Sequence, residues 1–79
     1  MNQYQPHQQR VVDEKAELDD RRSKLAAFLY TGTFEALDAA ERERLEKQLR
    51  LMTSYSDVLA ERIKAFTAGE AAATEGGAA

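Results

Sequence analysis

An aromatic residue, a proline and an arginine stand close together near the start of the chain, at Tyr4, Pro6 and Arg10. Pro6 suits the first position of a helix, because its fixed φ is helical and its missing N–H would be unsatisfied there anyway. An aromatic ring just ahead of such a helix can stack on a nucleobase, and the free N–H groups of the first turn favour an anion. In the alternative interpretation, Tyr4 and Pro6 form a staple that packs on the rest of the protein or on a neighbouring copy.

Cationic side chains gather further along the same predicted helix, and acidic side chains lie within one helical turn of them. The cations are Arg21, Arg22 and Lys24, and the acids are Glu17, Asp19 and Asp20. Such cations could face an anionic ligand at a junction between subunits. The alternative is ion pairing along the helix, which we expect for at least one of them. Arg62 is flanked by apolar residues and could serve as an interfacial ion pair or as a phosphate clamp, the ion pair being favoured by the sequence alone.

No constellation for catalysis or metal binding is visible in the sequence. The chain has no cysteine, its one histidine is His7, and no glycine-rich phosphate loop or Ser-His-Asp set is present. Pairs of carboxylates such as Asp13 and Glu17 have the spacing of an exposed helical surface and lack a companion histidine. We therefore expect a protein that is not an enzyme and that holds neither a cofactor nor a metal ion.

Length and composition narrow the class of protein. A chain of 79 residues without cysteine is too small for a comfortable core and has no disulfide or thiolate metal site to strengthen it. Self-association is the remaining way to bury more surface. The net charge of −3 argues against general binding of DNA. No apolar run is long enough for a membrane span and no signal pattern opens the chain, so we expect a cytosolic protein without a membrane partner.

The most regular pattern in the sequence predicts a long helix from about residue 39 to about residue 67. Its apolar seam, with steps of four and three, is Leu45, Leu49, Met52, Ser56, Leu59, Ile63 and Phe66. Ser56 alone interrupts this seam, and Tyr55 and Val58 broaden it. Asp38 has the position of an N-cap, with Glu41 three residues later in capping-box spacing.

An earlier helix is predicted from Pro6 to about Tyr30. Val11, Leu18 and Leu25 recur in it at intervals of seven, so that it is apolar near its ends and charged in its middle. Gly32 is predicted to end this helix in a left-handed conformation, and Thr33 to cap a short turn that extends to Leu37. A connection this short returns the second helix antiparallel to the first.

The sequence therefore predicts an all-α fold, an antiparallel helical hairpin over residues 1–67, followed by a flexible Ala- and Gly-rich tail over residues 68–79. The second helix has more apolar surface than one partner helix can cover. Candidates for contact with other copies are Phe34, Leu37, Tyr55 and Val58. We expect an obligate, compact homo-oligomer.

Two runs of the sequence resemble a family of small bacteriophage proteins. The first is Pro6-His7-Gln8-Gln9-Arg10-Val11-Val12-Asp13-Glu14-Lys15-Ala16-Glu17-Leu18, continued by Lys24-Leu25 and Phe28-Leu29. The second comprises Gln48-Leu49, Met52, Tyr55-Ser56, Val58-Leu59, Arg62-Ile63 and Phe66. The resemblance covers roughly Tyr4 to Phe66, and it is to the second-described class of phage anti-CBASS proteins, which are sponges for cyclic oligonucleotides.

This resemblance implies a compact homohexamer that binds cyclic dinucleotides, and in some members cyclic trinucleotides, without cleaving them. Effectors of the bacterial CBASS defence would then lack their signal in the cytoplasm of the infected host. By the same resemblance Tyr4, with Gln5 beside it, meets the base, and Arg62 serves a second site. A basic residue of the first helix meets the phosphates, and Lys24 is chosen among Arg21, Arg22 and Lys24. The candidate ligand-binding residues are Tyr4, Gln5, Pro6, His7, Arg10, Lys24 and Arg62.

A helical homo-oligomeric module that binds another protein remains the alternative function. Its apolar stripe would be equally well explained by contacts between copies. An aromatic residue ahead of Pro6, by contrast, is not needed by a plain packing module.

Overall fold

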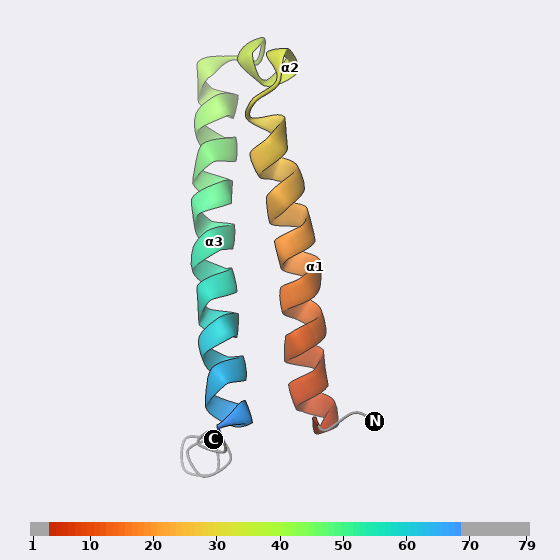
Figure 1. The fold of residues 1–79 in the computed structure, drawn as a ribbon. Coiled ribbons are helices and arrows are strands. Elements are labelled where there is room, and N and C mark those ends of the chain that lie inside the picture. The colour runs from red at the N-terminus through yellow and green to blue at the C-terminus, as the bar shows by residue number, and fades with distance from the viewer. Residues whose placement is uncertain (1–3, 69–79) are drawn as a thin grey trace.

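A computed structural model of the protein describes residues 4–68, and all regular structure in that range is helical. The elements are α1 (Pro6–Phe28), α2 (Gly32–Glu35) and α3 (Ala39–Thr67). The long helices α1 and α3 lie side by side and run in opposite directions, with α2 between them at one end (Figure 1). The predicted antiparallel helical hairpin is confirmed. The predicted tail, apart from Ala68, lies outside the described residues.

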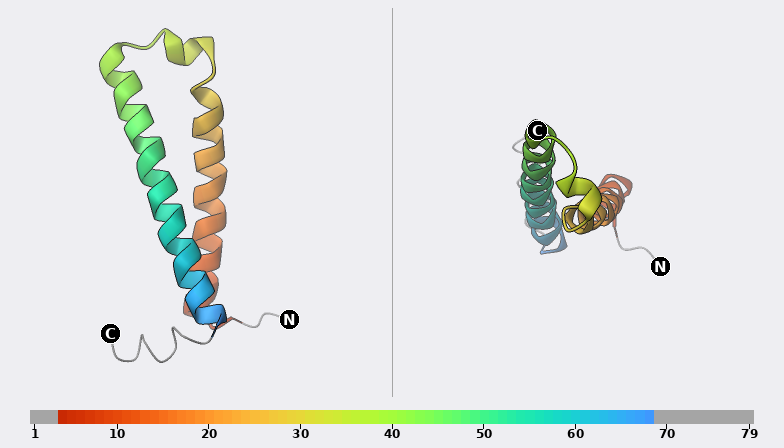
Figure 2. Two further views of the ribbon diagram at one scale, coloured as in Figure 1. Left: turned by 60° about the vertical axis from the view of Figure 1, so that its left-hand side comes forward. Right: turned by 90° about the horizontal axis from the view of Figure 1, so that it is seen from above.

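We call the end of the hairpin that carries α2 the closed end. The other end, where α1 begins and α3 finishes, is the open end. Two further views show that α1 and α3 are inclined to one another, as two helices packed through their side chains usually are (Figure 2).

Local capping explains where the two long helices begin. The backbone N–H of Gln5, the N-cap of α1, donates a hydrogen bond of 2.8 Å to Oε1 of Gln8. At the start of α3, Oδ1 of Asp38 accepts a hydrogen bond of 3.0 Å from the backbone N–H of Glu41. Each cap satisfies a backbone N–H that has no partner within the helix. The predicted start of α1 at Pro6, the Asp38 cap and the end of α3 near residue 67 are confirmed.

The connection between the helices differs from the prediction. α1 ends at Phe28 and is followed by Leu29 in a right-handed conformation, while Gly32 is the first residue of α2 and is not a left-handed terminator. The capping residue is Thr31 rather than Thr33. Its hydroxyl donates to the carbonyl oxygen of Phe28 at 2.7 Å and accepts from the N–H of Phe34 at 3.2 Å. Because one hydroxyl serves both helix ends, a left-handed residue is not required here.

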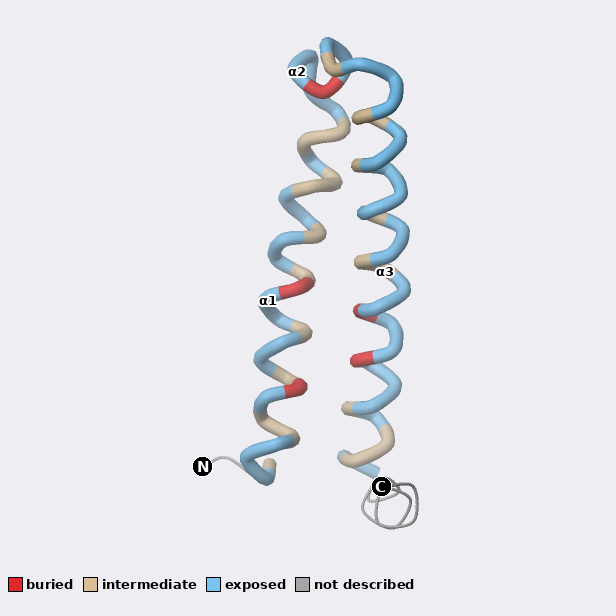
Figure 3. Tube along the Cα trace, turned by 180° about the vertical axis from the view of Figure 1, so that it is seen from behind, coloured by how far each residue is buried: buried red, intermediate tan, exposed pale blue. Residues whose placement is uncertain are grey.

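The apolar core lies in the half of the hairpin nearer the open end (Figure 3). Val11 and Leu18 of α1 pack with Leu59 of α3, whose side chain is completely buried. Partly buried apolar side chains that pack against this cluster are Met52, Ile63 and Phe66. Toward the closed end the seam residues are only half-buried, namely Leu25, Leu45 and Leu49. The protomer thus leaves part of its own seam accessible.

Phe34 corrects one of the expected contacts with other copies. Its side chain is 7% exposed, and its ring lies edge-to-face with the ring of Phe28, with centroids 6.0 Å apart. The short helix α2 turns Phe34 back over the closed end of its own protomer. Phe34 is therefore part of the protomer's packing and not an exposed contact for a neighbour.

Candidate functional site

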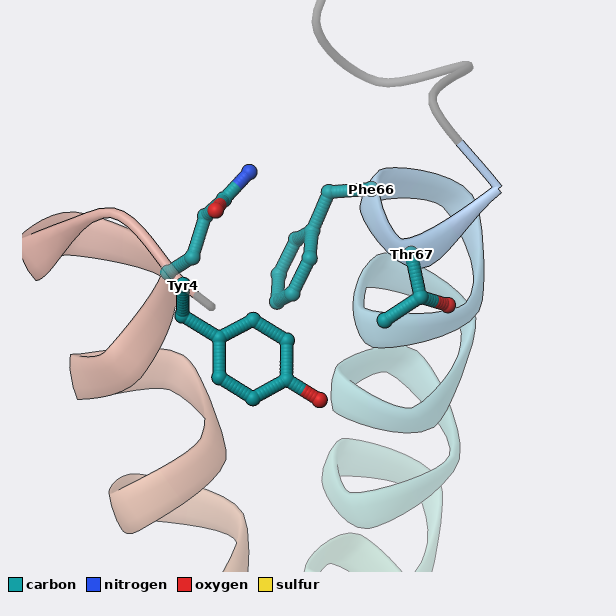
Figure 4. Close-up of a pocket in the computed structure, with 4 residues that line it drawn as sticks. Tyr4, Phe66 and Thr67 are labelled. Carbon is teal, nitrogen blue, oxygen red and sulfur yellow. The ribbon is translucent and has the colours of Figure 1, made fainter. Parts of the chain in front are cut away.

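The open end brings the residue ahead of α1 against the last turn of α3. The rings of Tyr4 and Phe66 lie edge-to-face, with centroids 5.6 Å apart and planes at 80°. Figure 4 shows the two rings pointing toward one another in the space between the helices, with Thr67 beside them. Together with Gln8 these residues line an open groove of about 240 Å³.

The Tyr4 contact bears on both interpretations of this residue. Tyr4 packs on the hairpin, as expected for a staple, and its partner is Phe66. An edge-to-face contact involves at most one face of each ring. The contact with Phe66 therefore does not by itself occupy both faces of the Tyr4 ring.

The other N-terminal candidates occupy the first turns of α1 at the open end. Gln5, Pro6, His7 and Arg10 are all exposed. No acidic residue lies in the first turn of α1. The positive end of the helix dipole, and Arg10 one turn further on, are thus accessible to an anion without a competing carboxylate in that turn.

Arg62 belongs to the same end of the hairpin. It is exposed on α3, four residues before Phe66, which corresponds to about 6 Å along the helix axis. No ion pair links Arg62 to another residue of the range 4–68. Its guanidinium is accessible to a partner outside the protomer.

Lys24 lies too far from the open end to join Tyr4 within one protomer. It follows Pro6 by 18 residues of α1, or about 27 Å of helix, which exceeds the width of a cyclic dinucleotide. Its Nζ atom lies 3.0 Å from Oδ2 of Asp20. The structure thus brings the N-terminal candidates and Arg62 together and leaves Lys24 apart. Lys24 can share a ligand with Tyr4 only if the two residues come from different copies.

The cations in the middle of α1 all have acidic neighbours along the same helix. The nitrogen–oxygen distances are 3.7 Å for Arg21–Glu17, 3.8 Å for Arg22–Asp19 and 3.0 Å for Lys24–Asp20. The expected ion pairing is confirmed. Exposed pairs of this kind are weak, because water and salt screen them. The pairing does not prevent Lys24 from exchanging Asp20 for a phosphate.

A polar junction between α1 and α3 was not foreseen from the sequence. The hydroxyl of Ser56, which is 5% exposed, donates a hydrogen bond of 2.6 Å to Oδ1 of Asp19. Nζ of Lys15 lies 2.6 Å from the other carboxylate oxygen. The hydrogen bonds from Lys15 and Ser56 lower the pKa of Asp19 below its ordinary value of 3.8, against an opposing effect of desolvation.

The junction affects the site because it constrains how α1 aligns with α3. A single polar contact inside an apolar seam favours the one register that satisfies it. That register decides which residues face each other at the open end. The available sequence signal was Ser56, the one polar residue in the seam, but nothing in the sequence identified its partner.

An apolar stripe remains exposed on the side of α3 that does not contact α1. Leu51, Tyr55 and Val58 are spaced by four and three residues and are 60%, 44% and 49% exposed. We call these three residues the outer stripe. Tyr55 and Val58, which the sequence analysis names as candidates for contact with other copies, are both exposed on this face. Leu51 was missed, although its position four residues before Tyr55 places it on the same helical face.

Among residues 4–68 no three or more His, Cys, Asp and Glu side chains are placed to hold a metal ion. Neither long helix in this range contains an apolar stretch that could cross a membrane.

The model of the Sequestin family matches residues 5–65, which is well over half of the chain. The chain therefore belongs to the Sequestin family. The family name is consistent with a protein that sequesters a ligand, in agreement with the resemblance to cyclic-oligonucleotide sponges. No curated protein and no solved structure matches the chain.

Proposed function

We propose that this member of the Sequestin family binds cyclic oligonucleotide signals and holds them uncleaved, so that effectors of bacterial CBASS defence are not activated. The observation that carries the proposal is the open end, where the Tyr4 ring, packed edge-to-face on Phe66, lies beside the N-terminus of α1. Arg10 and Arg62 add accessible positive charge at the same end. Cyclic dinucleotides are the primary ligands and cyclic trinucleotides are further ligands; Arg62 is the candidate for a second site.

The absence of cleavage is part of the proposal. The sequence has no cysteine, and its one histidine is exposed on the first turn of α1. A sponge without a catalytic group must bind tightly to be effective, and a Kd of about 1 nM corresponds to about −12 kcal/mol. Rigid walls from several subunits would help to reach that affinity, because little ordering then remains for the binding step.

The proposed active form is a homo-oligomer in the cytoplasm of the infected bacterium, with six copies as in the sponge family that the sequence resembles. Two observations support self-association. The outer stripe leaves three large apolar side chains accessible on one face of α3. The length of α1 between Pro6 and Lys24 means that a cleft using both Tyr4 and Lys24 must lie between copies.

The outer stripe also favours a second candidate function, a helical module that docks on another protein. The two candidates differ in what they bind at the open end. A thermal-shift experiment with cyclic di-AMP and cyclic di-GMP separates them, because a tight ligand raises the melting temperature by mass action. An unchanged melting temperature with both ligands would favour the protein-binding module.

The main test is depletion followed by recovery. The protein is mixed with a small excess of sites over cyclic dinucleotide, and free ligand is measured after filtration. We expect free ligand to fall, and intact cyclic dinucleotide to return when the protein is denatured by heat. Recovery of linear or hydrolysed nucleotide would contradict sequestration and indicate an enzyme.

A matched pair of variants tests the open end. Tyr4→Ala should weaken binding by about 1–3 kcal/mol, the contribution of one stacked base, or about 5- to 150-fold in Kd. Tyr30→Ala is the control, because Tyr30 is 90% exposed near the closed end. It should leave Kd unchanged. Equal Kd values for wild type and Tyr4→Ala would remove Tyr4 from the site.

A further inference from the structure

We propose that Phe66 is a positioning residue of the nucleotide site, which holds the Tyr4 ring in place before the ligand arrives. This inference rests on the proposed function and deepens it. It concerns the last turn of α3, whose apolar residues were expected to serve only as core.

Tyr4 depends on tertiary contact for its position. It precedes the first helical residue, Pro6, and so lies outside the regular hydrogen-bonding pattern of α1. Its ring meets the ring of Phe66, which comes from the opposite end of the described chain. Phe66 thus connects the segment ahead of α1 to the final turn of α3.

Phe66 is itself well anchored. Its side chain packs against the buried cluster that contains Leu59. The backbone around it is closed by a hydrogen bond of 3.1 Å from the N–H of Ala68 to the carbonyl oxygen of Lys64. One side of Phe66 is therefore held by the core while its ring contacts Tyr4. An anchored ring of this kind can limit the movement of its neighbour.

Hydrogen bonds also order the two other residues that line the groove beside the ring pair. Gln8 contributes its Oε1 to the cap of α1, and the hydroxyl of Thr67 donates a hydrogen bond of 3.1 Å to the carbonyl oxygen of Lys64. Both residues line the groove next to Tyr4 and Phe66. A base that stacks on Tyr4 would meet walls that are already ordered.

Such ordering has a direct consequence for affinity. An aromatic side chain that is free to rotate loses conformational entropy when a base stacks on it, and this loss weakens binding. The edge-to-face contact with Phe66 removes part of that rotational freedom before the base arrives, and it occupies at most one face of the Tyr4 ring. In this proposal Phe66 acts by holding the Tyr4 ring, and Tyr4 is the residue that stacks on the base.

The experiment measures Kd for cyclic di-AMP and for cyclic di-GMP with the full-length protein. The variants are Phe66→Leu, Tyr4→Ala and the two combined. Phe66→Leu should raise Kd by about 3- to 10-fold, the range expected for loss of one aromatic pair. In the Tyr4→Ala background the same change should raise Kd by less than about 2-fold, because residues that act as a unit are not additive.

Phe34→Leu is the matched control, because it removes the other edge-to-face pair of the hairpin, Phe28–Phe34, at the closed end. It should lower the melting temperature without raising Kd. The ring protons of Tyr4, assigned by comparison with Tyr4→Phe, should lose their ring-current shift in Phe66→Leu. If Phe66→Leu reduces helicity, Phe66→Met replaces it, since methionine fills apolar space without a ring.

The possible outcomes separate the inference from the function on which it rests. Wild-type protein that binds neither dinucleotide overturns the proposed function and the inference together. Wild-type binding that Tyr4→Ala weakens, with an effect of Phe66→Leu that is absent or the same in both backgrounds, overturns the inference alone. In that case Phe66 has only a packing role.

Discussion

Leu51 offers the sharpest test of self-association. Its side chain is 60% exposed in the protomer, in one stripe with Tyr55 and Val58. Full burial of a leucine side chain contributes about 1.5–3 kcal/mol. Covering the exposed 60% in an assembly is therefore worth about 1–2 kcal/mol for each copy. Leu51→Ala should remove most of this contribution without disturbing the contacts between α1 and α3.

Light scattering over a dilution series measures the effect. Wild-type protein should form an assembly larger than one chain, and Leu51→Ala should shift its dissociation to concentrations about 5- to 30-fold higher for each covered leucine. Circular dichroism at high concentration should show the same helicity for both proteins. Leu59→Ala makes the same chemical change on the same helix at a completely buried position, and should lower helicity at every concentration.

Two results would refute this reasoning. If the wild-type protein remains a folded single chain at all concentrations, the outer stripe does not drive assembly. If wild type and Leu51→Ala dissociate at the same concentration, Leu51 is not in the interface, and the contact surface must lie elsewhere.

The remaining predictions concern the stability of the hairpin. Leu59→Ala should lower the free energy of unfolding by about 2–5 kcal/mol, a large share of the total for so small a protein. Thermal unfolding followed by circular dichroism would measure this loss. The pKa of Asp19 is lower in the folded protein than its ordinary value of 3.8. The ionised carboxylate therefore stabilises the fold fully at pH values above 3.8, and this stabilisation is lost as the pH falls from 3.8 through the folded-state pKa. Ser56→Ala removes one cause of the lowered pKa, so the melting temperature should fall at neutral pH and depend less on pH in acid. An acid-unfolding profile identical to that of wild type would show that the Ser56–Asp19 hydrogen bond does not contribute.

Local features of the sequence were enough to predict the helices and most of their ends. Pro6 and the Asp38 cap act within one helical turn, and the apolar seam of α3 repeats with the helical period. Residues close together in the sequence are therefore sufficient to predict these helices. The connection was less predictable, because the sequence favoured Thr33 as the cap, whereas Thr31 caps α2 in the structure. The choice between them depended on how the hydroxyl of Thr31 reaches both helix ends.

The sequence by itself determined the helical hairpin, the excess apolar surface of α3 and the types of residue available to bind a nucleotide. Only the tertiary structure decided which of those residues meet. Asp19 and Ser56 join across 37 positions, and Tyr4 meets Phe66 from opposite ends of the described chain. Helical periodicity specifies which face of each helix is apolar, but it leaves the alignment of one helix along the other open. That alignment is set by packing and by the few polar contacts that a single register can satisfy, and it placed Tyr4 beside Phe66 and left Lys24 far from both.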